Sequence, residues 1–153
     1  MDHVVYLDAK EKELDKLRSG QKSMIIRGAA GRKLPHGRVH PGEVLWFVEN
    51  SGDGLVRCCA KVKKVFSSEK LTEEESQKLI SDHQTMLCLT PNQIKRWGGK
   101  RYLVLIEVEY LQEITPFAVD RSSYGNMDDW LPAKDIESIK NLLSQVNGQT
   151  GKD

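Results

Sequence analysis

Hydrophobic and polar residues alternate most regularly between Leu55 and Phe66, in the stretch LVRCCAKVKKVF. One set of alternate positions carries small and apolar side chains, namely Val56, Cys58, Ala60 and Val62. The other set carries Arg57, Cys59, Lys61 and Lys63. A period of two indicates a β-strand with one face in the core and the other in water.

Four more segments have the apolar and β-branched composition of strands, and turn or helix signals separate them. We predict strands at His3–Leu7, Ser23–Arg27, Glu43–Glu49 and Arg101–Glu113.

Helix-start signals accompany each predicted helix. Asp8 can cap the first helix, while Thr72 with Glu75 and Thr90 with Gln93 have the spacing of capping boxes. The predicted helices span residues 9–20, 72–83, 91–97 and 135–146.

Strands and helices do not alternate strictly along the chain, which argues against a parallel sheet with crossover helices. We therefore predict an α+β fold: a mostly antiparallel sheet or small barrel, with helices packed outside it. A chain of 153 residues has room for one such domain.

No apolar run approaches the length of a membrane helix, and the polar N-terminus is unlike a signal peptide. We expect a cytoplasmic protein that does not enter membranes, with its three cysteines reduced.

Positive charge is concentrated in one part of the chain, although the formal net charge is only +1. The segment from Lys16 to Gly42 contains no acid, and its residues 28–42 are rich in glycine and proline, which predicts a long loop. Its positive residues are Lys16, Arg18, Lys22, Arg27, Arg32, Lys33 and Arg38. Such a segment can neutralise phosphates, so it favours RNA or a nucleotide as a partner. The alternative is an ordinary solvated loop.

A second basic cluster contains an aromatic residue. Lys95, Arg96 and Trp97 are followed closely by Lys100 and Arg101. Trp97 could stack on a base while its neighbours contact a phosphate. The alternative is that Trp97 packs in the core at a helix end.

Other chemistry has little support in the sequence. His36 and His40 lie four apart, but Pro35 and Pro41 interrupt the loop, so we expect no metal site. No phosphate-binding loop, dinucleotide fingerprint or Ser-His-Asp order appears, so we expect no cofactor. The acidic pair at 128–129 caps the last helix in the simplest interpretation; alternatively, it docks beside the basic loop.

The order of motifs resembles the ASCH domain, a branch of the PUA-like superfamily. The matching features are Gly20, Lys22 and Arg27 in a G-x-K-x-x-x-x-R pattern, followed by the segment HPGEVL at 40–45. This resemblance implies a five- or six-stranded barrel with a basic cleft, lined by Lys22 and Arg27, that faces RNA or a nucleotide-like ligand. The resemblance covers roughly residues 3–114. We expect a barrel domain at 1–114, a C-terminal loop and helix at 115–146 packed on the same domain, and a flexible tail at 147–153.

Some members of that family resemble hydrolases that deacylate acetylcytidine. They use the motif lysine, a threonine three residues later and a glutamate further along. Here Lys22 matches, but Ile25 stands in place of the threonine and residues 81–89 contain no glutamate. The resemblance thus makes Lys22 the catalytic candidate if the chain is an enzyme of this kind.

We interpret the protein as an RNA- or nucleotide-binding module. The alternatives are a small hydrolase of acylated nucleosides, a ribonuclease and a protein-interaction domain; the sequence does not identify a protein partner. The predicted nucleic-acid-binding residues are Lys22, Arg27, Arg32, Lys33, Arg38, Lys95, Arg96 and Trp97.

Overall fold

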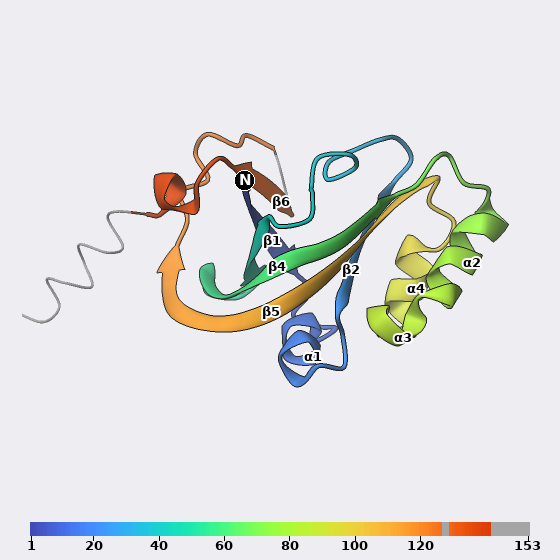
Figure 1. Cartoon of the computed structure of the whole chain (residues 1–153), viewed down its shortest axis with the longest axis horizontal. Coiled ribbons are helices and arrows are strands. Elements are labelled where there is room, and N and C mark those ends of the chain that lie inside the picture. Colours follow the sequence, from blue (N-terminus) through green and yellow to red (C-terminus); the bar gives the residue numbers. More distant parts are fainter. Residues whose placement is uncertain (127–128, 142–153) are drawn as a thin grey trace, which may run out of the picture.

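The computed structural model describes residues 1–126 and 129–141, which form a curled sheet with helices around it (Figure 1). Its strands are β1 (Asp2–Leu7), β2 (Met24–Ala29), β3 (Val44–Glu49), β4 (Leu55–Ser67), β5 (Tyr102–Ala118) and β6 (Trp130–Ala133). The helices are α1 (Glu13–Ser19), α2 (Glu73–Asp82), α3 (Gln84–Leu87), α4 (Pro91–Trp97) and a 3₁₀ helix, η1 (Ile136–Ile139). The predicted α+β class is confirmed, with β6 and α3 as unpredicted elements.

The six strands follow the order β2-β5-β4-β3-β1-β6, so the sheet is a half-barrel with two free edges. Neighbouring strands are antiparallel, except that β1 and β3 are parallel. The long β4–β5 pair changes register at three points, and Tyr110 in β5 has a φ of 56°. Irregularities of this kind bend a strand and increase its twist, which explains the curl.

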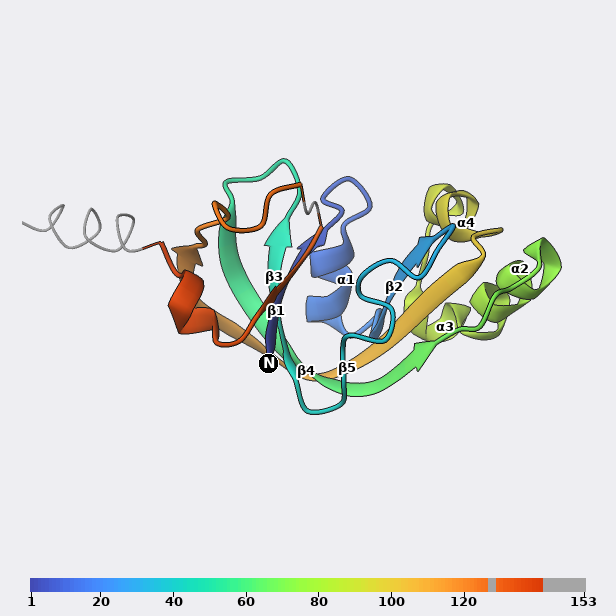
Figure 2. The same ribbon diagram turned by 90° about the horizontal axis from the view of Figure 1, so that it is seen from above.

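Both faces of the sheet are covered by packed side chains. The inner face forms a cluster to which α1 contributes Leu14 and Leu17. The outer face of β2 and β5 packs against α2, α3 and α4, and Figures 1 and 2 show these helices gathered at one end of the sheet. Successive β5 residues alternate accordingly, since Val104 belongs to the inner cluster while Leu103 and Leu105 belong to the outer one.

The predicted capping boxes are both present. Thr72 accepts the backbone N–H of Glu75 and opens α2, while Thr90 accepts that of Gln93 and opens α4. The predicted start of the first helix at Ala9 is wrong. Residues 9–12 form a turn in which the Asp8 side chain accepts the N–H groups of Lys10 and Glu11, and α1 begins only at Glu13.

The C-terminal part differs most from the prediction. The segment that contains Pro132 forms β6, an edge strand beside β1, where the missing N–H of proline is tolerated. The predicted helix at 135–146 is wrong where it can be compared, because only the short η1 forms there and Lys140 then pairs with Val119 in an isolated β-bridge. Residues 142–146 of that helix and the predicted tail at 147–153 lie outside the described residues.

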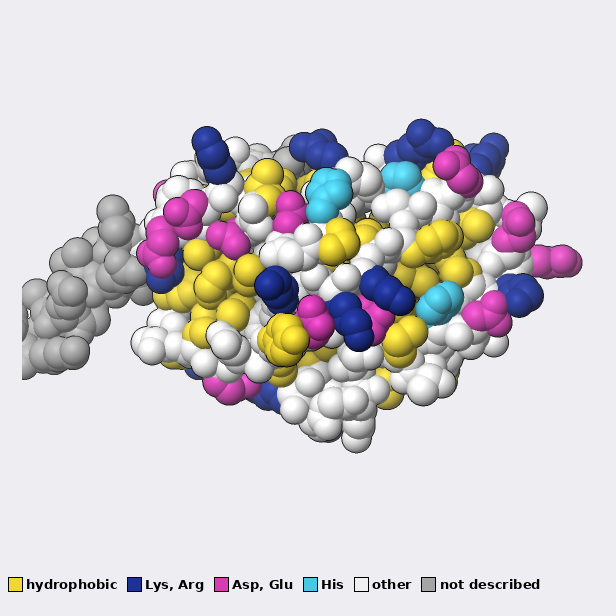
Figure 3. All heavy atoms as spheres, viewed as in Figure 1, with side chains coloured by type: hydrophobic (Ala, Val, Ile, Leu, Met, Phe, Trp, Pro, Cys, Tyr) yellow, Lys and Arg dark blue, Asp and Glu magenta, His cyan; other side chains and the backbone are white. Residues whose placement is uncertain are grey.

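Charges of both signs are mixed on the surface. Figure 3 shows basic and acidic side chains interspersed over one face rather than gathered into a single large field. Within the described parts of the chain, no helix has the length and apolar character needed to cross a membrane.

Candidate functional site

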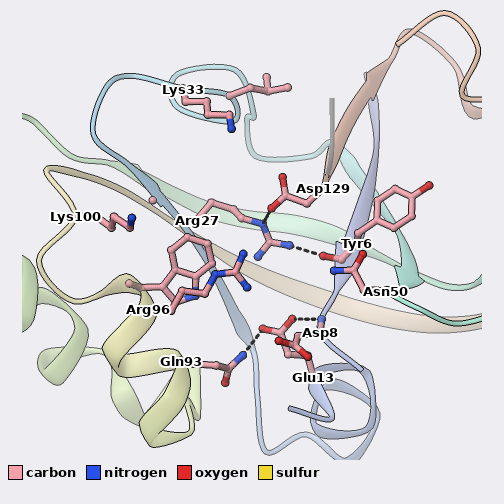
Figure 4. Close-up of a pocket in the computed structure, with 13 residues that line it drawn as sticks. Tyr6, Asp8, Glu13, Arg27, Lys33, Asn50, Gln93, Arg96, Lys100 and Asp129 are labelled. Carbon is pink, nitrogen blue, oxygen red and sulfur yellow. Dashed lines mark hydrogen bonds and ion pairs between the residues drawn. The ribbon is translucent and has the colours of Figure 1, made fainter. Parts of the chain in front are cut away.

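A pocket of about 330 Å³ lies between the strand β2, the end of β1 and the helix α4 (Figure 4). Its lining residues are Tyr6, Asp8, Glu13, Arg27, Gly28, Lys33, Leu34, Asn50, Gln93, Arg96, Trp97, Lys100 and Asp129. The elements that meet here are far apart in the sequence. Gly28 allows the close packing at this point, since a Cβ atom there would lie 2.7 Å from Leu103 Cδ2.

Arg27 joins the two ends of the half-barrel across this pocket. Its guanidinium donates one hydrogen bond to the carbonyl of Ile26 at 2.8 Å and another to the carbonyl of Tyr6 in β1 at 2.6 Å. Its Nε atom forms an ion pair at 3.1 Å with a carboxylate oxygen of Asp129, just before β6. Arg27 is 7% exposed, so this side chain serves mainly to connect three segments.

The contact with Asp129 decides between the two interpretations of the acidic pair. Asp129 lies beside the basic segment, and Asp135 caps η1 instead by accepting the N–H of Glu137. Asp128 lies outside the described residues.

Glu13 forms the polar floor of the pocket. This carboxylate is 3% exposed and accepts hydrogen bonds from the backbone N–H of Asp8 at 2.9 Å and from Gln93 Nε2 at 3.0 Å. The oxygen of the same Gln93 amide accepts the N–H of Thr90 in the capping box. The capping box that starts α4 therefore also fixes the Gln93 amide, which in turn donates to Glu13.

Lys22 lies behind Glu13, and its side chain has no exposed surface. Its Nζ atom donates to the carbonyl of Leu87 at 2.6 Å and lies 3.8 Å from Glu13 Oε1. Burial lowers the pKa of Lys22 to about 8, because the ammonium loses its water, while the nearby Glu13 carboxylate opposes this change. Lys22 does not itself line the pocket.

Three exposed cations surround the mouth of the pocket: Lys33, Arg96 and Lys100. Across residues 1–126 and 129–141, no carboxylate lies within ion-pair distance of any of them. The Arg96 guanidinium lies over the ring of Trp97, 4.5 Å from its centroid. Trp97 is 7% exposed and packs in the outer cluster, as the core alternative predicted, while part of it lines the pocket.

The remaining predicted site residues lie away from the pocket. Arg32 pairs with Glu69 at 3.2 Å, and its guanidinium lies over the ring of Tyr102. Arg38 and Lys95 are exposed and do not line the pocket. The structure thus brings together four of the eight predicted residues: Arg27, Lys33, Arg96 and Trp97.

Sequence analysis missed the acidic and amide groups of the pocket. Glu13 shares a helix face with Leu17, four residues later, which was a usable signal for an inward-facing carboxylate. Gln93 had already been assigned a capping role. No local signal indicated that Asp8 or Asn50 would line the same pocket, whereas the alternative that the acidic pair docks beside the basic loop anticipated the position of Asp129.

Comparison with known proteins identifies the fold. No protein-family model matches the sequence, and no curated protein matches it. Among solved structures, the ASCH protein of Zymomonas mobilis is similar to this chain with a TM-score of 0.65 and 15% identity, over 92% of this chain and 96% of that chain. Two single-residue mutants of that protein, one Tyr-to-Phe and one Ser-to-Ala, give TM-scores of 0.66 at 15% identity. They cover 90% of this chain and 93% and 91% of theirs. The chain therefore has the ASCH fold, as its resemblance predicted.

The buried lysine predicts a specific pH dependence of stability. The pKa of Lys22 is about 8 in the folded state and 10.5 as its ordinary value, so the unfolded chain binds more protons between these limits. Stability should therefore rise as pH increases from about 8 to 10.5, by up to about 3 kcal/mol, whereas below pH 8 the cost of burying the charge is fully present.

Urea unfolding of the wild type and of Lys22→Met between pH 7 and 10.5 measures this effect. Methionine has a similar length and no charge, so the difference between the two proteins isolates Lys22 from other titrating groups. We expect the wild type to gain stability relative to the variant above pH 8. Parallel profiles would show that Lys22 is not desolvated.

Proposed function

We propose that the pocket binds one nucleotide, either free or as a single unstacked residue of an RNA strand. The observation that carries the proposal is a set of three cations at the mouth of a pocket with a hydrogen-bonding floor. These cations are Lys33, Arg96 and Lys100, and none of them has an acidic partner among the residues that the structure describes. Such cations favour a phosphate, while the polar interior suits a base edge.

The distribution of charge supports this placement of the phosphate. Asp129 already neutralises Arg27, and Lys22 is enclosed behind Glu13. An added anion is therefore stabilised most at the mouth, since its cations face water and no carboxylate of residues 1–126 or 129–141 pairs with them. A volume near 330 Å³ is at the lower end of the usual range for small-ligand pockets, which favours a single nucleotide over a longer segment.

Aromatic surface at the pocket supports recognition of a base. Trp97 forms part of the wall, and the Arg96 guanidinium that lies over its ring offers a flat cationic surface. Bases of single-stranded RNA stack on such aromatic and guanidinium planes once they leave their own helix. The proposal therefore favours single-stranded over duplex RNA. We place this activity in the cytoplasm, where the free thiols of Cys58, Cys59 and Cys88 would remain reduced.

The salt dependence of binding tests the phosphate contacts. Each phosphate contact that is lost should reduce the slope of log affinity against log salt by roughly one for duplex and somewhat less for single strands. Lys33→Ala combined with Lys100→Ala should therefore weaken binding of a short single-stranded RNA and reduce its slope by between one and two, measured by fluorescence anisotropy at several salt concentrations.

A charge-matched control is available on β4, where Lys61 and Lys64 are exposed and lie outside this pocket. Lys61→Ala with Lys64→Ala lowers the net charge equally and should leave the slope nearly unchanged. Equal effects of the two double variants would show that only the overall charge matters, and an unchanged slope in the first would place the phosphates elsewhere.

Deacylation of acylated nucleosides is a second candidate, and one observation favours it. Lys22 has a lowered pKa and lies beside a carboxylate, which are features of nucleophilic or basic lysines. Against it, the Lys22 side chain is shielded from solvent, and Ile25 is fully buried in the inner cluster without a hydroxyl group.

We therefore expect no release of acetate from acetylcytidine by the wild-type protein. The assay should follow acetate enzymatically, with Lys22→Ala and Lys61→Ala as parallel samples. Turnover that is abolished by Lys22→Ala but retained in Lys61→Ala would establish the hydrolase and reject a purely binding role.

A further inference from the structure

The pocket has an acidic end and a basic end. In Figure 4, Asp8 and Glu13 lie together beside Gln93, while Lys33 and Lys100 lie at the opposite side of the pocket. The two ends of a nucleotide match these two ends of the pocket. Its phosphate is an anion that suits the cations, and its base edge carries hydrogen-bonding groups that suit the carboxylates. If the phosphate lies at the cations, the base edge points toward the two carboxylates.

The two carboxylates retain acceptor sites that hydrogen bonds from the described residues do not fill. Asp8 Oδ1 accepts the backbone N–H groups of Lys10 at 2.9 Å and Glu11 at 3.2 Å, which use its two lone pairs. Asp8 Oδ2 receives no hydrogen bond from the residues that the structure describes. In Glu13 each oxygen accepts one protein hydrogen bond, so each keeps one further acceptor site.

We infer that this acidic end selects bases that carry an exocyclic amino group, and that Asp8 determines this preference. The inference rests on the nucleotide-binding function proposed above. The amino groups of cytosine and adenine can donate to Asp8 Oδ2. Uracil and hypoxanthine place a carbonyl oxygen at the same position, so two acceptors would face each other without a proton between them. A site built for a donor discriminates strongly against an analogue that lacks it.

Two pairs of nucleotides test this preference while the size of the base stays constant. Cytidine and uridine monophosphates differ at the amino position and the adjacent ring nitrogen, as do adenosine and inosine monophosphates. Titration calorimetry at one pH and one salt concentration should show at least about tenfold tighter binding of the amino-bearing member in both pairs.

The substitution Asp8→Asn should abolish or reverse the preference. The amide oxygen can still accept the N–H groups of Lys10 and Glu11, so the turn is retained, while the amide nitrogen replaces Oδ2 and donates to a carbonyl. Uridine and inosine monophosphates should then bind at least as tightly as their partners. Asp15→Asn is the matched control, because Asp15 is an exposed carboxylate of α1 that does not line the pocket.

The outcomes distinguish failure of the base preference from failure of the nucleotide-binding function. Binding of all four nucleotides with equal affinity by the wild type would overturn the base preference, and the nucleotide-binding function would stand. A preference that persists in Asp8→Asn would overturn the role of Asp8. Absence of binding by all four would overturn the inference, and the titration with short single-stranded RNA described above then decides whether the proposed function fails as well. If Asp8→Asn fails to fold, the wild-type comparison within the two pairs still decides the preference.

Discussion

The Arg27 guanidinium links the two ends of a sheet that backbone hydrogen bonds do not close into a barrel. The edge strand β2 and the strands at the other end of the sheet never form a ladder with each other. Arg27 spans the gap instead, through the Tyr6 carbonyl and the Asp129 carboxylate. A ladder would bring the two backbones to about 5 Å, whereas a long side chain holds them further apart. The pocket occupies the space that results.

Much of the charge of the basic segment serves the fold rather than a ligand. Arg27 is committed to its three contacts and Lys22 is enclosed with Glu13, whereas Arg32 forms only an exposed ion pair with Glu69. Buried charges require such partners because unpaired ones are costly away from water. The exposed cations that line a pocket are those at its mouth, where side chains from the basic loop and from α4 and its following turn meet. The two basic clusters of the sequence thus contribute to one site.

Local patterns predicted much of the fold. The capping boxes of α2 and α4 depend only on neighbouring residues, and the structure has both. The alternation predicted for β4 is present from Cys58 to Lys63, except that Cys59 is buried as well. Val56 packs in a separate cluster from Cys58, because the register shifts between these two residues. The strand β6 has four residues including a proline, too few to show a period, and depends on pairing with β1. The site was predictable only where it depends on local sequence features. Exposed cations can be recognised from charge alone, whereas the positions of Glu13 and Asp129 depend on segments that meet only in the folded chain.

The central claim is that a nucleotide occupies the pocket beside Trp97, and the three tryptophans allow a direct test. Trp97 lines the pocket, whereas Trp46 packs against Phe117 in a separate cluster. The measurement is a titration of ¹⁵N-labelled protein with adenosine monophosphate, observed through the indole N–H signals. Our account predicts a saturable shift of the Trp97 signal while that of Trp46 stays in place. A shift of Trp46 without Trp97, or no shift of either at saturating ligand, would contradict it.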